Sequence, residues 1–298
     1  MSLFKTFLDL LLDGIFILRH GDPKTRGRIF VAHIKINLKH LFLVKLLRLN
    51  IQSEILLGQR VYFFNYTVFT WFFLENFVRR EYLFTSTAKS PLIIDCGSNI
   101  GMATLFFKLQ YPESRILAFE PDPKTFGMLK RNVEENHLTD VTLFNAALSA
   151  NEGQIDFFVD PDLPGSPIMS TNPLRISKEK MRVRATILSK EITEEVDFLK
   201  MDIEGAEVEV MNELGKSGKL ALVREMVIEY HHHISPEVDH LSQILSLLES
   251  SGFGYQLHTS FPSPFHGKRF QDILIYGYRK VSPSANLRPE LAGVASSR

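Results

Sequence analysis

Two acidic residues each follow an apolar run of the sequence, in an arrangement suited to holding a nucleoside. Asp95 ends the first run and precedes a turn with Gly97 and Gly101, and Glu120 ends a second run about twenty residues beyond that turn. This order is typical of a nucleotide-binding β-α-β unit, in which the acidic residue of the second strand holds ribose hydroxyls. The two oxygens of Glu120 could accept one hydrogen bond from each hydroxyl.

The first turn favours a ligand with a positive end over a dinucleotide. Its glycines are spaced G-x-x-x-G rather than G-x-G-x-x-G, and Asp95 would repel a pyrophosphate docked at the helix N-terminus. The ammonium and sulfonium of S-adenosylmethionine suit such a carboxylate. The alternatives are a purely structural turn for Asp95 and a helix-end charge for Glu120. Asp122 already supplies that helix charge, which leaves Glu120 available for a ligand.

Acidic residues also gather after a later apolar run, which predicts a strand over residues 196–201. Lys200, Asp202, Glu204 and Glu207 surround the end of this strand, where open α/β sheets place their chemistry. Asp202 is the first candidate for a carboxylate that orients a substrate or takes its proton. Glu204 could instead cap the following helix, and Lys200 could simply pair with a buried carboxylate.

The next predicted strand, residues 222–230, leads into the sequence EYHHH. Glu229 and His231 are two residues apart and therefore share a face of the strand. A neutral His231 imidazole could take the proton of a hydroxyl group. Asp202 with Glu229 could also hold a divalent cation, and the three histidines could suggest zinc, but neither set completes the ligands of such an ion. The sequence therefore predicts no metal.

The elements that must position these residues alternate regularly along the chain. Apolar runs and turn residues predict an α/β fold with a mostly parallel, doubly wound sheet that ends in an antiparallel pair. A looser section over residues 153–187 predicts two strands around a Pro/Gly/Ser loop, which could be a lid or a plain connector. The main strands are predicted at 92–96, 116–120, 141–145, 196–201, 222–230, 253–259 and 271–279, with helices at 101–110, 123–137, 205–213 and 236–251.

The first 50 residues predict two or three helices with an apolar face. Leu8, Leu11, Leu12 and Ile15 share one side of the first helix, and the second mixes basic residues with leucines. A basic amphipathic helix can lie on an anionic membrane. Amphipathic helices more often bury their apolar face in protein, which favours a cap on the main domain or on a second subunit.

An aromatic segment precedes the first β-α-β unit. Residues 59–64 predict a short strand, and the segment after it predicts a helix that ends near Arg80. Its large aromatic side chains are predicted to lie in the core. They are Trp71, Phe72, Phe73 and Phe77.

Composition narrows the class of protein. The 298 residues contain 34 Lys and Arg and 34 Asp and Glu, so the overall charge gives no reason to expect a nucleic-acid partner. Residues 1–50 hold nine basic and three acidic residues, an excess of six positive charges. Cys96 is the only cysteine, so we expect a packed thiol and a reducing cytoplasm. We expect neither a membrane-spanning helix nor a signal peptide.

Four motifs together resemble the FkbM family of S-adenosylmethionine-dependent methyltransferases. They are LIIDCGSNIGMATLFF, ILAFEPDP, VTLFNAALS and VDFLKMDIEGAEVEVM. The resemblance covers roughly residues 55–280. Outside it are a helical extension, residues 1–54, and a tail, residues 281–298, which is predicted to be disordered. The resemblance implies the class I methyltransferase fold, a Rossmann-like sheet of seven strands with helices on both faces and the last strand antiparallel.

The resemblance also implies an activity and a cofactor. Family members are similar to O-methyltransferases that act on hydroxyls of sugars, polyketides and related small molecules. The turn after the first strand would hold the methionine part of S-adenosylmethionine, and the end of the third strand would lie near its adenine. Asp202, Glu229 and His231 are the catalytic candidates. The residues predicted to bind the cofactor are Asp95, Gly97, Asn99, Gly101, Glu120, Asn145, Ala146 and Asp202.

Other functions and partners stay open at this point. A cofactor-binding or membrane-associated module without catalysis would bind S-adenosylmethionine without turning it over. A nucleic-acid methyltransferase is disfavoured, because the chain lacks an N/D-P-P-Y type motif and is not basic overall. The expected partner is a small-molecule or glycan acceptor. A peripheral membrane contact through residues 1–50 and a homo-oligomer are further options.

Overall fold

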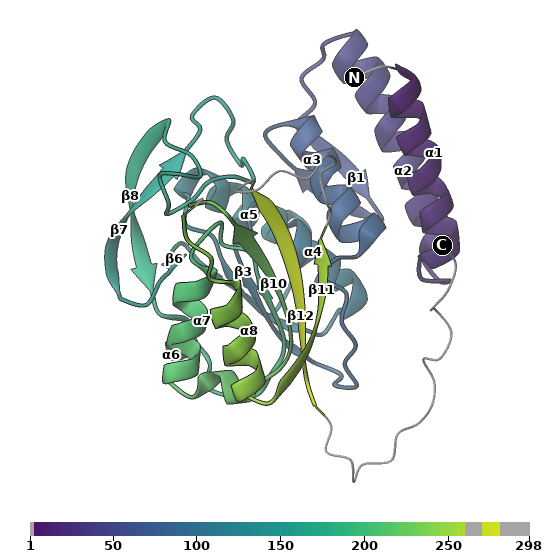
Figure 1. The fold of residues 1–298 in the computed structure, drawn as a ribbon. Helices are drawn as coiled ribbons and strands as arrows, with labels where there is room; N and C mark the ends of the chain where they lie inside the picture. Colours follow the sequence, from purple (N-terminus) through teal and green to yellow (C-terminus); the bar gives the residue numbers. More distant parts are fainter. Residues whose placement is uncertain (1–2, 236, 260–269, 281–298) are drawn as a thin grey trace.

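The computed structural model describes residues 3–235, 237–259 and 270–280, and it shows a central sheet between two layers of helices (Figure 1). The predicted tail, residues 281–298, lies outside the described residues. The strand order is β11-β12-β10-β9-β3-β4-β5, and neighbouring strands are parallel except where β12 takes part. This order confirms the predicted class I methyltransferase fold. The strands are β3 (Leu92–Cys96), β4 (Arg115–Phe119), β5 (Val141–Phe144), β9 (Val196–Met201), β10 (Val223–His232), β11 (Phe253–Thr259) and β12 (Gln271–Arg279).

Successive strand residues point into different helical layers, as the period of a strand requires. Ile93 packs in the core beneath α3, α4 and α5, whereas Ile94 packs in the core beneath α6, α7 and α8. The two layers lie on opposite faces of the sheet in Figure 1. Cys96 is fully buried in the second core, as predicted for a packed thiol. These helices are α3 (Tyr66–Phe73), α4 (Met102–Gln110), α5 (Pro123–Glu135), α6 (Leu188–Glu191), α7 (Glu207–Lys216) and α8 (Leu241–Ser250), and a 3-10 helix, η3 (Lys219–Leu222), precedes β10.

Two smaller sheets differ from the sequence prediction. Strands β1 (Ser53–Leu56) and β2 (Gln59–Tyr62) form an antiparallel hairpin where a single strand was expected. A three-stranded sheet has the order β6-β8-β7, and its short strand β6 was not predicted. A two-residue strand carries too little periodicity to be recognised from the sequence. The strands of this three-stranded sheet are β6 (Ala147–Leu148), β7 (Gly153–Val159) and β8 (Glu179–Thr186).

Two helices begin later than predicted. Helix α7 starts at Glu207 rather than at residue 205, because Glu204 and Gly205 have φ values of 53° and 111°, outside the helical region. Helix α8 starts at Leu241 rather than at residue 236. In the first case the chain turns sharply just before the helix, and this turn brings Glu204 back toward the carboxyl end of the sheet.

The N-terminal helices form a hairpin at the edge of the molecule (Figure 1). Ile17, Ile29 and Ile36 join the core shared with α3–α5, so the inner side of the hairpin packs as a cap. Glu54 is buried beneath it and pairs with Lys35 at 3.0 Å and with Lys39 at 2.7 Å. The elements are α1 (Leu3–His20), α2 (Arg26–Lys39) and the π-helices η1 (His40–Leu46) and η2 (Leu74–Arg79), of which η2 continues α3.

The aromatic segment is buried except at one position. Phe72, Phe73 and Phe77 lie in the core, as predicted. Trp71 is 52% exposed, so its predicted core position is wrong. It lies on the opposite side of α3 from Phe73 and lines a cavity. Among the described residues, every helix is too short or too polar to span a bilayer.

Candidate active site

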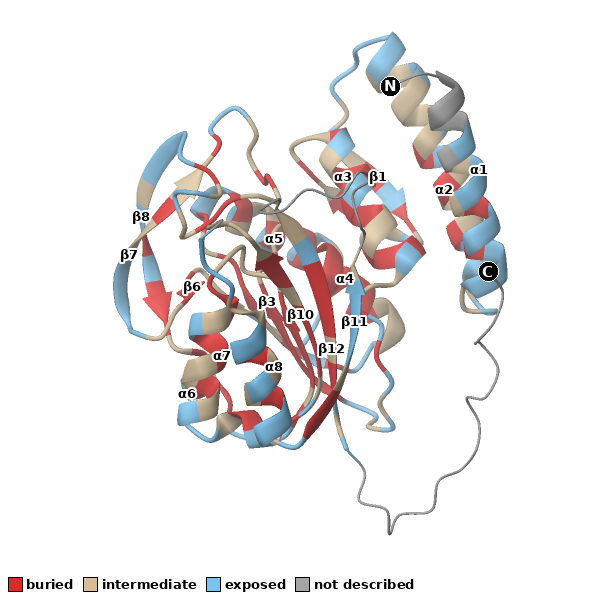
Figure 2. Cartoon of the chain, viewed as in Figure 1, coloured by how far each residue is buried: buried red, intermediate tan, exposed pale blue. Residues whose placement is uncertain are grey.

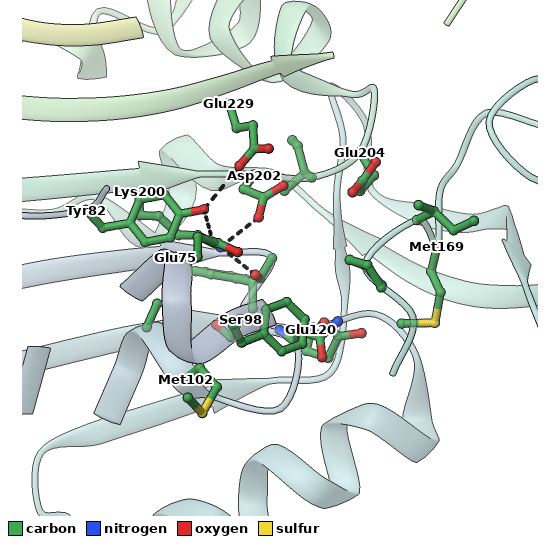
Figure 3. Close-up of a pocket in the computed structure, with 18 of the residues that line it drawn as sticks. Glu75, Tyr82, Ser98, Met102, Glu120, Met169, Lys200, Asp202, Glu204 and Glu229 are labelled. Carbon is green, nitrogen blue, oxygen red and sulfur yellow. Dashed lines mark hydrogen bonds and ion pairs between the residues drawn. The ribbon is translucent and has the colours of Figure 1, made fainter. Parts of the chain in front are cut away.

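A cavity of about 410 Å³ lies at the carboxyl ends of β3, β4, β9 and β10 (Figure 3). Its volume falls in the range of roughly 300–1,000 Å³ usual for small-molecule sites. The order of strands reverses beside β3, and open α/β sheets bind ligands at such a reversal. One end of the cavity, here called the Glu120 end, is formed by residues 97–100, 102–103 and 119–121. The other, called the Lys200 end, is formed by Glu75, Tyr82, Lys200, Asp202 and Glu229.

Glu120 is buried at the end of β4 and is held by backbone groups. Its Oε2 accepts a hydrogen bond from the N–H of Asn99 at 3.0 Å, and its Oε1 accepts one from the N–H of Asp122 at 3.0 Å. Each oxygen has a second lone pair for a ligand. Burial raises the pKa of Glu120 to about 8, although the two N–H donors act against this. A ligand that donates hydroxyl groups would favour the ionised form, which suits the predicted ribose contact.

The turn after β3 approaches the end of β9 so closely that a side chain is excluded. Gly97 has a φ of 78°, and a Cβ there would stand 1.7 Å from the carbonyl oxygen of Asp202. Gly97 and Asn99, two of the residues predicted to bind the cofactor, line the cavity. Gly101 does not line it. A Cβ at Gly101 would meet the side chain of Leu129 at 2.7 Å, so this glycine serves strand–helix packing instead.

Asp95 and Lys200 form a buried ion pair behind the turn. Asp95 was predicted to act on a ligand ammonium directly or through water. It is fully buried and is not part of the cavity wall, so the direct contact is corrected and the contact through water stays a prediction. Its Oδ2 accepts from the Thr104 hydroxyl at 2.7 Å, and its Oδ1 lies 3.5 Å from the Lys200 Nζ. Lys200 also donates to the carbonyl of Gly97 at 2.6 Å and lies 3.4 Å from Asp202 Oδ2. Asp95 therefore acts on the cavity through Lys200.

Lys200 remains charged despite its burial. Burial alone would lower the pKa of its ammonium, but the carboxylates of Asp202 and Asp95 raise it above the usual value. The ammonium ties the turn after β3 to the end of β9, because it bonds to Gly97 and lies beside Asp202. The alternative in which Lys200 simply pairs with a buried carboxylate is confirmed. The same lysine also joins the two ends of the cavity.

Tyr82 links two partly buried carboxyl groups at the Lys200 end (Figure 3). Its hydroxyl oxygen lies 2.6 Å from Glu75 Oε1 and 3.1 Å from Glu229 Oε2. A phenol has one hydrogen to donate, so both contacts can be hydrogen bonds only if one carboxyl group carries a proton. Burial, reinforced by the charge of Asp202, raises the pKa of Glu75 to about 8 and that of Glu229 well above its usual value. This trio therefore holds a proton at neutral pH.

The three predicted catalytic residues do come together. Asp202, Glu229 and His231 each offer one atom within 4.8 Å of the others, although only Asp202 and Glu229 line the cavity. His231 is buried, with Nδ1 at 2.8 Å from Glu207 and Nε2 at 3.2 Å from Glu204. Burial alone would lower the pKa of His231, but these two carboxylates raise it well above its usual value. The imidazolium has no lone pair for a proton, so the predicted role of His231 as a neutral base is corrected.

Glu204 belongs to the site rather than to the helix that follows. Its carboxylate accepts a hydrogen bond from Arg175 Nε at 2.8 Å as well as facing His231. The N–H of Gly205 donates a hydrogen bond to Glu207 Oε1 at 2.9 Å. The alternative in which Glu204 caps α7 is therefore wrong, because its carboxylate pairs with Arg175 and His231 instead.

The two residues predicted near the adenine have different positions. Ala146 lines the cavity. Asn145 does not, because its Nδ2 donates to the carbonyl oxygens of Glu120 at 2.9 Å and of Pro121 at 3.1 Å. Asn145 could have bonded the adenine edge or been an ordinary loop residue, and these contacts favour the second, because Asn145 holds the loop that carries Glu120.

The Pro/Gly/Ser loop forms a wall of the cavity. Residues 166–169 and Thr171 line it. The Ser170 hydroxyl donates to the carbonyl of Glu204, and Asn99 donates to the carbonyl of Ser166 at 3.5 Å. Of the two predicted roles, lid or connector, these contacts support a loop that shapes the site.

The sequence prediction missed residues that line the Lys200 end. Glu75 and Asn76 come from η2, and Tyr82 follows it. Asn76 is buried, and its Oδ1 accepts no hydrogen bond from any described residue. A signal was present in the sequence, because polar residues interrupt an otherwise aromatic helix at these positions. Buried polar side chains need hydrogen-bond partners, so polar residues within an aromatic helix indicate a polar site nearby. Here that site is the cavity.

Negative charge predominates around the cavity. Seven carboxylate residues and three lysine or arginine residues line it within the described parts of the chain. All three cations are already paired, Arg79 with Glu81, Arg175 with Glu204 and Lys200 with Asp95. Two groups of described residues could hold a metal ion. They are Asp202, Glu229 and His231, beside the Lys200 ammonium, and His232, His233 and Asp239, outside the cavity.

Comparison with known proteins gives one family. Residues 95–257, more than half of the chain, match the family model described as the Methyltransferase FkbM domain. Methyltransferase sdnD of Sordaria araneosa is 29% identical over 213 residues, which cover 60% of this chain and 80% of that protein. The 2-O-methyltransferase NoeI of Sinorhizobium fredii is 29% identical over 217 residues, which cover 66% of this chain and 84% of that protein.

Among solved structures, a methyltransferase FkbM from Methylobacillus flagellatus aligns with 92% of this chain at 16% identity and a TM-score of 0.45. The chain spans 58% of the length of that protein. The fold assignment rests on the strand order rather than on this similarity. The family match begins at Asp95, so Glu75 and Tyr82 of the Lys200 end lie outside it.

Proposed function

The chain belongs to the FkbM methyltransferase family, and on that premise we propose that it transfers the methyl group of S-adenosylmethionine to a hydroxyl of a small molecule or glycan. One observation carries the proposal. A single cavity joins Glu120, at the end of the second parallel strand, to an end rich in hydrogen-bond acceptors that includes Asp202. The first end suits the nucleoside, and the second suits a group that donates hydrogen bonds.

The Glu120 end has the donor and acceptor set that S-adenosylmethionine needs. Glu120 would accept the ribose hydroxyls, and the turn at Gly97 and Asn99 would bring backbone groups against the methionine part. Ala146 would leave room for the flat adenine ring. When bound, the cofactor supplies a methyl group made electrophilic by a positive sulfur. The chain then has to hold the acceptor in line, exclude water and receive a proton.

The Lys200 end favours a hydroxyl over an anionic acceptor. Asn76 Oδ1 is buried and has no hydrogen-bond donor among the described residues, so a ligand that donates would satisfy it. The excess of carboxylates would repel a carboxylate or phosphate group. The same excess opposes a nucleic-acid substrate.

Methyl transfer to a hydroxyl releases one proton, because the O–H bond breaks as the O–C bond forms and the S–C bond breaks. Asp202 lines the cavity, is partly exposed and is held by Lys200, so we assign it to orient the hydroxyl and receive the proton. Glu75, Tyr82 and Glu229 already share a proton at neutral pH, which makes them poor receivers below about pH 8. Below that pH they keep this proton and can exchange hydrogen bonds with the substrate hydroxyl.

Titration with S-adenosylmethionine, followed by calorimetry, tests the cofactor half of the proposal. The unaltered protein should bind, and Glu120→Gln should weaken binding on the order of 100-fold, since two hydrogen bonds to a charged group are lost. Glu229→Gln makes the same chemical change at the Lys200 end and should leave cofactor affinity within a few-fold, by the same estimate. Equal weakening by both variants, or no heat on titration, would contradict the assignment of the Glu120 end.

Release of S-adenosylhomocysteine in the presence of candidate acceptors tests the second half. A panel of sugars and polyols should support turnover, whereas matched sugar acids and sugar phosphates should not. Asp202→Asn should lower turnover by roughly 100-fold or more while the protein still binds the cofactor. Turnover only with acidic or amine acceptors would show that the hydroxyl assignment is wrong. Unchanged turnover in Asp202→Asn would remove this residue from the proton path.

A further inference from the structure

Helix α1 presents a continuous apolar surface to solvent. Six of its large hydrophobic side chains are between 40% and 54% exposed. They recur three, four and seven residues apart, so they share one side of the helix, and Ile17 on the other side is buried. The exposed stripe along α1 is visible in Figure 2. These residues, here called the α1 face, are Leu8, Leu11, Leu12, Ile15, Phe16 and Leu18.

The rest of the hairpin continues this pattern. Val31, Leu38 and Phe42 are exposed on α2 and η1, and Leu46, Leu47 and Leu49 are exposed at the end of the hairpin. Twelve of the nineteen exposed large hydrophobic residues in the described chain therefore lie before residue 50. The other seven are scattered over the main domain, which is normal for a folded protein. A surface of this kind marks an interaction site.

Positive charge accompanies the apolar surface. Residues 1–50 carry nine basic and three acidic residues. Lys35 and Lys39 face inward to the buried Glu54, so their charges are partly neutralised. The basic side chains exposed around the hairpin are Arg19, Lys24, Arg26, Arg28, Lys45 and Arg48.

We propose that the α1–α2 hairpin docks on an anionic lipid bilayer, with the α1 face in the acyl boundary and the exposed basic residues at the head groups. Apolar burial and attraction to anionic lipids act together at such a helix. A second copy of the chain suits the surface less well. A symmetric dimer would bring the same positive surface against itself.

The docking hairpin is attached to the cavity. Helix α1 packs against η2, and η2 supplies Glu75, Asn76 and Arg79 to the cavity wall. Docking of the hairpin would therefore bring the Lys200 end close to the lipid surface. The inner side of the hairpin stays packed on the main domain through Ile17, Ile29 and Ile36, so docking requires no separation of the hairpin.

Flotation of the full chain with lipid vesicles tests the proposal. Vesicles of phosphatidylcholine mixed with phosphatidylglycerol should carry the protein, and vesicles of phosphatidylcholine alone should carry much less. Added salt should weaken the binding, because it screens the basic residues. Equal binding to both vesicle types, or no binding to either, would overturn the proposal.

Matched variants locate the contact. Leu11→Glu places a charge on the α1 face and should lower binding at least tenfold. Leu257→Glu makes the same change at a residue of nearly equal exposure on β11, 47% against 48%, and should leave binding unchanged. Lys45→Glu should lower binding roughly fivefold or more, whereas Lys216→Glu on the main domain should not. Circular dichroism melting checks that each variant is folded.

Two other occupants of the α1 face would each give a distinct result. If a second copy covers it, sedimentation without lipid shows a dimer that Leu11→Glu converts to a monomer, and vesicles do not bind. If the C-terminal tail covers it, only a chain shortened to residue 280 binds vesicles. Either result overturns the proposal. A monomer that binds anionic vesicles through Leu11 supports it, whether or not the protein methylates a hydroxyl.

Discussion

The Glu120 end and the Lys200 end of the cavity are held together by different kinds of contact. At the Glu120 end, backbone groups hold the key side chain, and a glycine turn sets the distance between two strands. At the Lys200 end, side chains converge from separate parts of the chain and are held by charge and shared protons. These side chains are Glu75 of η2, Tyr82, Lys200 of β9, Asp202 just after β9 and Glu229 of β10.

Because of this difference, the two ends should tolerate amino-acid substitutions to different degrees. A turn with no room for a Cβ allows only one backbone arrangement. The Glu120 end can therefore recognise one ligand and little else. Separate side chains can be exchanged one at a time, so the Lys200 end can be adapted to different acceptors. The family match includes all of the Glu120 end and also Lys200, Asp202 and Glu229 of the Lys200 end, but it begins after Glu75 and Tyr82.

Removal of the Lys200 ammonium should have the largest effect on the Lys200 end. Lys200→Met would leave Asp95 buried and charged without its counter-ion, at a cost of about 3–5 kcal/mol in the free energy of unfolding. Urea denaturation measures this cost. Lys216→Met, on the surface of α7, should change stability by less than about 0.5 kcal/mol. A small effect of Lys200→Met would mean that charge does not hold this end together.

Gly97→Ala probes the Glu120 end. The added Cβ would meet the carbonyl oxygen of Asp202 and would also sit at positive φ, so we expect a loss of roughly 2–4 kcal/mol in the free energy of unfolding. Gly218→Ala isolates the backbone effect, because Gly218 has nearly the same φ, 74° against 78°, with nothing within 4 Å of its Cβ. It should cost about 1–2 kcal/mol. Equal costs would show that close approach to Asp202 is not the constraint.

Stability of the Lys200 end should depend on pH through Glu75. Burial raises the pKa of Glu75 to about 8, so the folded chain keeps a proton that the unfolded chain loses above about pH 4.5. The contribution of this group is complete below that pH and is lost as pH rises toward about 8. Relative to Glu75→Gln, the unaltered protein should lose at most about 1.4 kcal/mol per pH unit over that interval.

Denaturation curves at several pH values for both proteins give this difference, and the comparison cancels the other titrating groups. Parallel curves for the two proteins would mean that Glu75 is ionised throughout. The proton shared with Tyr82 would then reside on Glu229 alone.

Glu229→Gln should have the smallest effect on stability. An amide closely resembles a carboxyl group that already carries a proton, so the free energy of unfolding at neutral pH should change by about 1 kcal/mol or less. Asp95→Asn gives the contrast, because it removes a charge that faces Lys200 and should cost distinctly more. If Glu229→Gln is the more damaging of the two, Glu229 is ionised in the folded protein.

Local pattern was sufficient for most of the sheet. Strands β3, β9, β11 and β12 have the predicted bounds, because each is a short segment whose apolar and aromatic residues either follow one another or alternate with other residues. The strand β6 and the exposed position of Trp71 were not predictable in this way. A two-residue strand exists only through its partner, and an aromatic residue beside a cavity has the same local sequence as one in the core.

The sequence by itself determined the fold, the glycine turn and the placement of Glu120 and Asp202 at the carboxyl ends of the strands on either side of β3, because these follow from short-range periodicity and from the topology of a parallel sheet. Only the tertiary structure decided the protonation and partners of the other groups. Asp95 faces Lys200, and His231 lies between Glu204 and Glu207. Tyr82 shares a proton between two carboxyl groups distant in sequence. Charge and burial act through space, so residues far apart along the chain set each other's state.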